Sequence, residues 1–417
     1  MGEWLVGHPG APMDNLQIES VAEATAIPLD PRARLRLRVD NFAHRLRQAA
    51  QRRIDRLDLA KSPRLLKILS ARRVCGASVV SHRPPVFLLP FGGERPLWMV
   101  EALGSHFPEE RALFLLLIYW SLENPKLVES ARLGAELHRS RFPKHALVFL
   151  CNTPLEQELL DAAGLVAIAA NHNLLVSEHT FRPLGDVAVA YDAVYNARLC
   201  RFKRHYLAAG IERVIHIAYC TGEMSPSASR VYMQRILSRS PQHRLANPLV
   251  DGLPSWIGAE DVNRIYNQAS VGLCLSPVEG AMYASMEYLL AGLPIVTTPS
   301  LGGRDAFFDA DFCLTVPPEV RAVRDAVVAL AERSIPRAVV RGKTLARVES
   351  ERRRSRLAIE NAIERQGLEV DATAIWPPPR GARDVAYAPV RDHIVRWREH
   401  GLAKQPRPPA RLAITGG

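Results

Sequence analysis

The chain has 417 residues, of which 47% are hydrophobic and 23% charged, and its formal net charge is +11. This composition is typical of a globular protein and excludes a disordered chain, a fibrous protein and a small disulfide-held module. Because a single core rarely grows beyond about 250–300 residues, the length predicts two large domains, or two with a helical appendage.

The positive charge is concentrated near the two ends of the sequence. Residues 32–73 contain 14 Lys and Arg against 3 Asp and Glu, residues 333–417 contain 18 against 9, and the remainder has a net charge of −9. Helical spacing of apolar residues in Phe42–Leu59 and Val348–Ile363 predicts basic helices. Two interpretations stay open: solvated helices that wrap the core, or arms that contact an anionic membrane surface or an acidic acceptor. Nucleic acid is not expected, because no recognised binding motif accompanies the basic residues.

No segment of the sequence predicts a membrane span. The longest apolar run, Ala112–Trp120, is about half the length that crosses a bilayer, and the N-terminus lacks a signal-peptide pattern. We therefore expect a cytoplasmic protein, peripheral at the membrane if its basic segments contact lipid. The six cysteines form no C-x-x-C pair, which predicts free thiols and no metal site built on cysteine.

From about residue 73, short apolar and β-branched runs alternate with helix-like stretches. This alternation predicts an α/β fold with two parallel sheets and crossover helices. A polar segment, Ser177–Gly185, is the predicted linker between the two sets of strands. The predicted strands are Val74–Val80, Val86–Pro90, Leu113–Trp120, Ala146–Cys151, Val187–Tyr195, Arg213–Tyr219, Val271–Ser276, Pro294–Thr298 and Phe312–Val316.

Four regions are expected from this pattern. They are a basic helical segment (residues 1–73), an N-terminal Rossmann-like domain (74–185), a C-terminal Rossmann-like domain (186–335) and a helical C-terminal segment with a tail (336–417). The last region contains proline-rich stretches at Trp376–Arg380 and Lys404–Ala410, with a predicted helix at Val390–His400 between them.

The segment Val271–Gly303 is the most informative part of the chain. An apolar strand stops at Ser276, a turn carries Glu279 and Gly280, and a helix runs from about Met282 to Ala291 before the next strand. A helix that begins at the carboxyl ends of parallel strands offers backbone N–H groups to phosphates. Glycine lets a ligand approach the backbone closely, and two fixed carboxylates, Glu279 and Glu287, suit a polyhydroxylated ligand.

The frame around these carboxylates resembles a known family. Glu279-x7-Glu287, within S-P-x-E-G-x6-E-x3-A-G-x-P-I-V-x-T, resembles the E-x7-E signature of the retaining glycosyltransferases of family 4 (the group 1 glycosyltransferases). Arg198-x4-Lys203 is similar to the basic pair of that family. The resemblance covers about Ala146–Leu330 and is absent from residues 1–73. It implies the GT-B architecture of two doubly wound Rossmann-like domains with a cleft between them.

The resemblance also implies an activity: a retaining, hexosyltransferase-like enzyme that moves a sugar from a nucleotide-diphosphate donor, held by the C-terminal domain, to an acceptor held by the N-terminal domain. No metal or other cofactor is implied. The catalytic residues would be Glu279, Arg198 and Lys203. Arg198 and Lys203 would hold the diphosphate, and Glu287 the ribose. The donor sugar would meet Glu279 and the backbone of Gly280, Ala281, Met282 and Tyr283.

Several points depart from the family or stay open. The basic pair is often followed by glycine in the family, but Arg204 follows it here. Gly92 and Gly93, after the strand Val86–Pro90, are candidates for a turn that faces the donor. His172 and His179 lie near the linker and are expected to be structural or exposed. A catalytically silent GT-B-like scaffold and another nucleotide-sugar enzyme, such as an epimerase or a synthase, remain alternatives. The donor nucleotide, the sugar and the acceptor stay undetermined.

Overall fold

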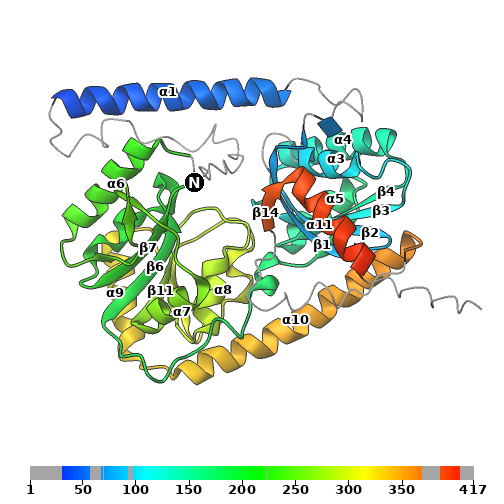
Figure 1. Ribbon diagram of the computed structural model, residues 1–417. Helices are drawn as coiled ribbons and strands as arrows, with labels where there is room; N and C mark the ends of the chain where they lie inside the picture. The colour runs from blue at the N-terminus through cyan, green and yellow to red at the C-terminus, as the bar shows by residue number, and fades with distance from the viewer. Residues whose placement is uncertain are drawn as a thin grey trace, which may run out of the picture.

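The computed structural model describes residues 31–56, 67–68, 70–92, 97–221, 223–368 and 386–403, and it contains two α/β domains, each built on a six-stranded sheet (Figure 1). The predicted fold class, with two Rossmann-like domains, is therefore confirmed. Gly93 and the proline-rich stretches Trp376–Arg380 and Lys404–Ala410 lie outside the described residues. Within the described part of the chain, no helix is long and apolar enough to cross a membrane.

The N-terminal domain has the strand order β14-β1-β2-β3-β4-β5. Strands β2 to β5 are parallel, whereas β1 is antiparallel to both of its neighbours. Every residue of β2 and β3 is buried, as expected for apolar strands covered on both faces. The bounds are β1 (Val74–His82), β2 (Pro85–Phe91), β3 (Ala112–Ile118), β4 (His145–Cys151), β5 (Ala167–Ala169) and β14 (Ala386–Pro389).

Four helices cover one face of this sheet: α3 (Trp98–Gly104), α4 (Pro125–Arg141), α5 (Pro154–Ala162) and α11 (Val390–Ala403). Asn124 and Thr153 start α4 and α5, each with a side-chain oxygen that accepts a backbone N–H of the first turn, and proline follows each. The sequence did not predict β14, because its four residues lack a strand pattern and pair only with the exposed edge of β1.

The C-terminal domain has a fully parallel sheet in the order β13-β12-β11-β6-β7-β8. Successive strands are added in one direction from β6 to β8 and in the opposite direction from β11 to β13, so the order reverses between β6 and β11. Ligands of such sheets bind outside the carboxyl ends of the strands at this switch point. The strands are β6 (Tyr191–Arg198), β7 (Val214–Tyr219), β8 (Arg244–Leu245), β11 (Ala269–Cys274), β12 (Ile295–Thr297) and β13 (Cys313–Thr315), beside a hairpin of β9 (Leu249–Val250) and β10 (Leu253–Pro254).

Helices and short 3-10 turns connect these strands. They are α6 (Pro226–Arg239), α7 (Ala259–Asn267), α8 (Tyr283–Leu290) and α9 (Val320–Glu332), with η4 (Arg201–Lys203), η5 (His205–Gly210) and η6 (Gly303–Phe307). A further turn, η3 (His172–Leu175), leads out of the N-terminal domain. The predicted strand Val187–Tyr195 lies about four residues early, because the observed β6 begins at Tyr191.

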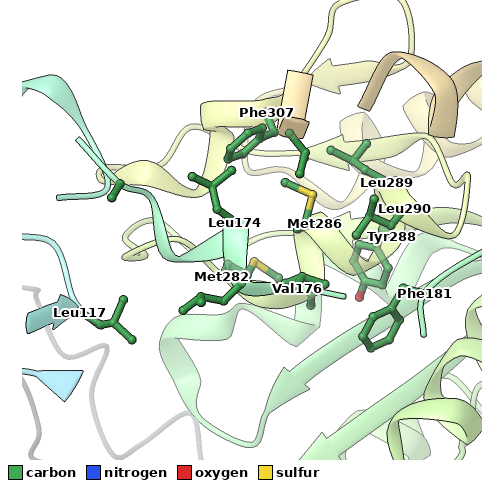
Figure 2. Close-up of a cluster of buried hydrophobic side chains, with 14 of the residues drawn as sticks. Leu117, Leu174, Val176, Phe181, Met282, Met286, Tyr288, Leu289, Leu290 and Phe307 are labelled. Carbon is green, nitrogen blue, oxygen red and sulfur yellow. The ribbon is translucent and has the colours of Figure 1, made fainter. Parts of the chain in front are cut away.

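An apolar core joins the two domains. The long helix α10 (Arg337–Arg365) runs past both domains (Figure 1) and contributes Val340, Val348 and Ile359 to this core. Figure 2 shows Leu117 of the N-terminal sheet, Leu174 of η3 and Met286 of α8 among the side chains of the same cluster. The domains are therefore held together by buried side chains as well as by the linker.

Two arginines of α10, Arg341 and Arg352, donate hydrogen bonds to backbone carbonyl groups between the domains. Arg352, 7% exposed, donates to the carbonyl oxygens of Leu174 (2.9 Å) and Val176 (2.8 Å) and pairs with Glu178 (2.9 Å). Arg341 likewise donates to the carbonyl of Phe181 at 2.7 Å. Part of the positive charge of residues 333–417 is thus structural, in agreement with a helix that wraps the core.

We predict that Arg352→Met lowers the free energy of unfolding by about 3 kcal/mol, because it leaves Glu178 and two buried carbonyls without their donor. The thermal midpoint should fall by roughly 5–10 °C. The matched control is Arg353→Met, which removes an exposed arginine from the same helix and should leave the midpoint unchanged. Equal effects of the two substitutions would contradict this role of Arg352.

Candidate functional site

Two cations lie at the switch point of the C-terminal sheet. Arg198 ends β6, and η4 follows at once and turns Lys203 back into the protein, where it is only 5% exposed. The fully buried Tyr195 of β6 donates a hydrogen bond from its hydroxyl to the carbonyl oxygen of Lys203. This bond fixes the backbone that carries the lysine.

Arg204, after the basic pair, has φ 51° and ψ 41°. This left-handed conformation is the one for which glycine is favoured, and other L-residues adopt it at a cost of about 1–2 kcal/mol. Arg204 thus keeps the turn geometry that glycine would adopt without strain.

Glu279 pairs with Lys203 across the switch point. It is 6% exposed, and one carboxylate oxygen accepts hydrogen bonds from the Lys203 ammonium and from the Ser276 hydroxyl. Burial raises the pKa of Glu279, but the charge and hydrogen bond of Lys203, together with Ser276, outweigh this effect and hold the pKa below its ordinary value. The site therefore contains a buried, ionised carboxylate in a fixed orientation.

The loop that carries Glu279 depends on Gly302. The Glu279 N–H donates to the carbonyl of Leu301 at 3.0 Å, and Gly302 has φ +88°. A Cβ atom at Gly302 would lie 1.8 Å from the Glu279 carbonyl oxygen. Glycine is required here because any side chain would displace the loop.

Arg198 lies between the two domains. Its guanidinium is 4.7 Å from the ring centroid of Phe202 and 5.8 Å from that of Trp120, which follows β3 of the N-terminal domain. It also pairs with Glu223 at 2.6 Å, and its side chain is 14% exposed. The aromatic contacts hold the arginine in place, and Glu223 is an anion that another anion can replace.

Among the described residues, the partner of Glu287 is a tyrosine hydroxyl rather than a cation. Tyr266 donates a hydrogen bond to it at 2.5 Å, and Asn196 donates to the Tyr266 hydroxyl at 2.5 Å. Burial raises the pKa of Glu287 to about 7, and the hydrogen bond from Tyr266 offsets only part of this rise. Within the part of the chain that the structure describes, no ion pair to Glu287 is found.

The loop from Gly280 to Tyr283 packs against the N-terminal domain. A Cβ atom at Gly280 would lie 2.8 Å from the Tyr119 carbonyl oxygen, so the group that approaches this glycine here is the backbone of the other domain. Asn173 donates to the carbonyl of Ala281 at 2.5 Å. Met282 has φ 56°, and α8 begins after it without a side-chain cap on its first turn.

His172 adjoins this loop from the N-terminal side. It is 4% exposed, its ring centroid lies 4.8 Å from that of Tyr283, and Nδ1 donates to the carbonyl of Ile118 at 3.1 Å. Burial lowers its pKa to about 4, partly opposed by the Ile118 hydrogen bond and the negative charge of Glu279. His172 is therefore a neutral imidazole beside Tyr283 at the domain interface.

The structure brings together Arg198, Lys203, Glu279 and the loop to Tyr283, with Glu287 further along α8. Gly92 follows β2, and a Cβ atom built on it would lie within 4 Å of no atom among the residues that the structure describes. The sequence analysis missed four residues that complete the site: Trp120, Asn173, Glu223 and Tyr266. Trp120 ends the predicted strand Leu113–Trp120 and Glu223 follows the predicted strand Arg213–Tyr219, so a position at the carboxyl end of a predicted strand is the signal that points to these two.

Comparison with known proteins finds no matching family model and no matching curated sequence. Solved structures do match. HepE from Anabaena in complex with UDP-glucose has 12% identity and a TM-score of 0.46, over 66% of this chain and 78% of that chain. The pneumococcal O-GlcNAc transferase GtfA in complex with UDP and GlcNAc has 14% identity and a TM-score of 0.43, over 67% and 56%. A glycosyltransferase from Rickettsia africae has 11% identity and a TM-score of 0.43, over 67% and 76%. At this level of similarity, a function can be argued only from the residues of the site.

We predict that Glu287→Gln stabilises the protein above neutral pH and leaves its stability unchanged near pH 4. The raised pKa means that the folded chain binds a proton between the ordinary pKa of 4.5 and about 7, so the wild type loses stability as the pH rises through this window. Glutamine, like the protonated acid, pays no such cost. The difference should reach the order of 3 kcal/mol above pH 7.

Thermal midpoints of the two proteins at pH 4 and pH 8 measure this effect. The midpoints should coincide at pH 4, and that of Glu287→Gln should be higher at pH 8. A constant difference at both values would mean that Glu287 does not titrate as its burial implies.

Proposed function

We propose that this protein is a retaining glycosyltransferase that transfers a sugar from a nucleotide-diphosphate donor to an acceptor. The supporting observation is the convergence of Arg198, Lys203 and Glu279 at the β6/β11 switch point, with Glu287 on the adjoining helix α8. This placement agrees with the roles that the sequence resemblance implies. The cations suit a diphosphate, and the carboxylates suit the hydroxyl groups of a sugar and a ribose.

Arg198 and Lys203 act on the leaving group. Each cation already has a carboxylate partner, so the diphosphate would bind Arg198 by replacing Glu223, while Lys203 keeps Glu279 as its partner and adds its positive charge to the site. Negative charge grows on the diphosphate as the bond between the sugar and phosphate breaks. Cations held by packing before the reaction stabilise this charge without reorganisation, which commonly lowers a barrier by several kcal/mol.

The reaction needs no protein nucleophile under this proposal. The bond from the anomeric carbon to the phosphate oxygen breaks, and the acceptor oxygen forms a new bond on the same face of the sugar. The acceptor proton passes to the departing phosphate oxygen, which accounts for retention. Glu279 is ionised and fixed by Lys203, so it can accept hydrogen bonds from the donor sugar and orient its anomeric carbon.

Glu287 holds the ribose of the donor nucleotide. Its carboxyl is partly buried with Tyr266 as its hydrogen-bond donor, and burial raises its pKa to about 7. Two ribose hydroxyl groups would supply further donors and favour the ionised form, which lowers this pKa on binding. We propose no metal requirement, because Arg198 and Lys203 supply the positive charge that the diphosphate needs.

We predict that one of UDP, GDP, ADP and dTDP binds the protein in calorimetric titrations that contain a chelator. Arg198→Gln should weaken this binding at least about tenfold, because it removes one ion pair with the diphosphate. The matched control is Arg201→Gln, which replaces an exposed arginine of η4, the turn that follows Arg198, and should bind like the wild type. Glu223→Gln should bind as tightly as the wild type or more so, since it frees Arg198.

Absence of binding by any of the four nucleotides would reject the donor site and favour a GT-B-like scaffold. Equal weakening by Arg198→Gln and Arg201→Gln would assign the effect to net charge rather than to the site.

We further predict that Glu279→Gln lowers the rate of sugar transfer at least about 100-fold while nucleotide binding persists. Glutamine keeps a hydrogen-bond acceptor for Lys203 and Ser276, and the thermal midpoint of the variant checks that the fold is maintained. The rate is measured with the sugar derivatives of whichever nucleotide binds, and NMR of the product reports the anomeric configuration. A wild-type rate in Glu279→Gln would remove Glu279 from the mechanism, an inverted product would reject retention, and conversion of the donor without an acceptor would favour an epimerase.

A further inference from the structure

Helix α1 (Pro31–Arg56) has an exposed apolar stripe. Leu35, Val39, Phe42 and Leu46 follow one another at intervals of four, three and four residues, so they lie on one side of the helix. They are 63%, 57%, 64% and 54% exposed. Large apolar side chains scattered singly on a surface need no explanation, but a contiguous stripe marks an interaction surface.

The opposite side of α1 is attached to the protein. Asn41 accepts a hydrogen bond from the Ser225 hydroxyl at 2.6 Å, and Asp40 accepts one from the Ser227 hydroxyl, both at the start of α6. At 100° per residue these two positions lie across the helix from the stripe. Figure 1 shows α1 along the outer edge of the molecule, with α6 beside one part of it. The stripe therefore faces away from the domain that holds the helix.

Arginines flank the stripe on both sides. Arg36 and Arg47 lie along one flank and Arg38 and Arg45 along the other, and all four are exposed. The helix contains nine arginines and two aspartates, and one of these aspartates, Asp40, bonds to Ser227. An apolar stripe between rows of cations is the pattern of a helix that lies in the interface of an anionic bilayer, where the stripe enters the acyl region and the cations meet lipid phosphates.

We propose that α1 docks the protein on a membrane surface rich in anionic phospholipids. The charge of the flanks selects lipid over a neutral or basic protein partner. Docking also places the candidate site near the bilayer. Ser225 binds Asn41 of α1 and is two residues from Glu223, the partner of Arg198. This proposal does not depend on sugar transfer, and its test contains no nucleotide.

Co-flotation of the full chain with vesicles tests the proposal. We expect binding to vesicles of phosphatidylcholine with about 30 mol% phosphatidylglycerol, weak binding to phosphatidylcholine alone, and at least about a tenfold fall in the partition coefficient when NaCl rises from about 0.1 M to about 0.5 M. Leu35→Gln with Phe42→Gln should lower the partition coefficient at least about tenfold. An independent pair, Val39→Gln with Leu46→Gln, should do the same.

The matched control is Arg353→Gln with Leu357→Gln on α10, where Leu357 is 59% exposed. This variant removes an exposed cation and an exposed leucine outside α1 and should bind like the wild type, and all variants should keep the wild-type thermal midpoint. The proposal is overturned if the full chain floats with neither vesicle, if it floats equally with both, or if both stripe variants bind like the wild type.

Discussion

The buried ion pair between Lys203 and Glu279 is the interaction on which the site depends. At an exposure of 5–6% each charge needs the other as its partner, because removal from water costs several kcal/mol for each ion. The pair is stable because the geometry is over-determined: Tyr195 fixes the backbone of Lys203, Ser276 donates to the same carboxylate oxygen, and Gly302 permits the loop around Glu279. A site built in this way is oriented before any ligand arrives.

The same loop also joins the domains, so the site and the domain interface share their constraints. Gly303 shows this clearly, because a Cβ atom there would lie 2.5 Å from the Cβ of Asn152 in the N-terminal domain, and its carbonyl oxygen accepts a hydrogen bond from Asn171 at 2.8 Å. Gly303 thus allows the backbones of the two domains to approach closely. A rotation of one domain against the other must break these contacts and shift the buried core around Leu117 and Met286.

Local patterns carried most of what the sequence could predict. The buried strands β2, β3, β4, β7 and β11 have long apolar runs and were placed within a few residues, and the Glu279–Glu287 spacing located the loop and helix α8. The short strands β5, β8 and β14 have only two to four residues and form because a partner edge is available, which no local pattern contains. For the same reason the sequence did not predict four residues of the site, because each acts through a contact between segments distant in the chain. They are Trp120, Asn173, Glu223 and Tyr266.

The two basic segments show why charge alone does not identify a function. Both are helical and both are rich in arginine, yet Arg341 and Arg352 of α10 donate to carbonyl groups between the domains, because the apolar residues of that helix bury one face of it. In α1 the attached face is polar, with Asp40 and Asn41 bonded to serines, so its apolar residues remain exposed between arginines. The position of the apolar residues relative to the attached face, rather than the count of cations, separates a structural helix from a docking helix.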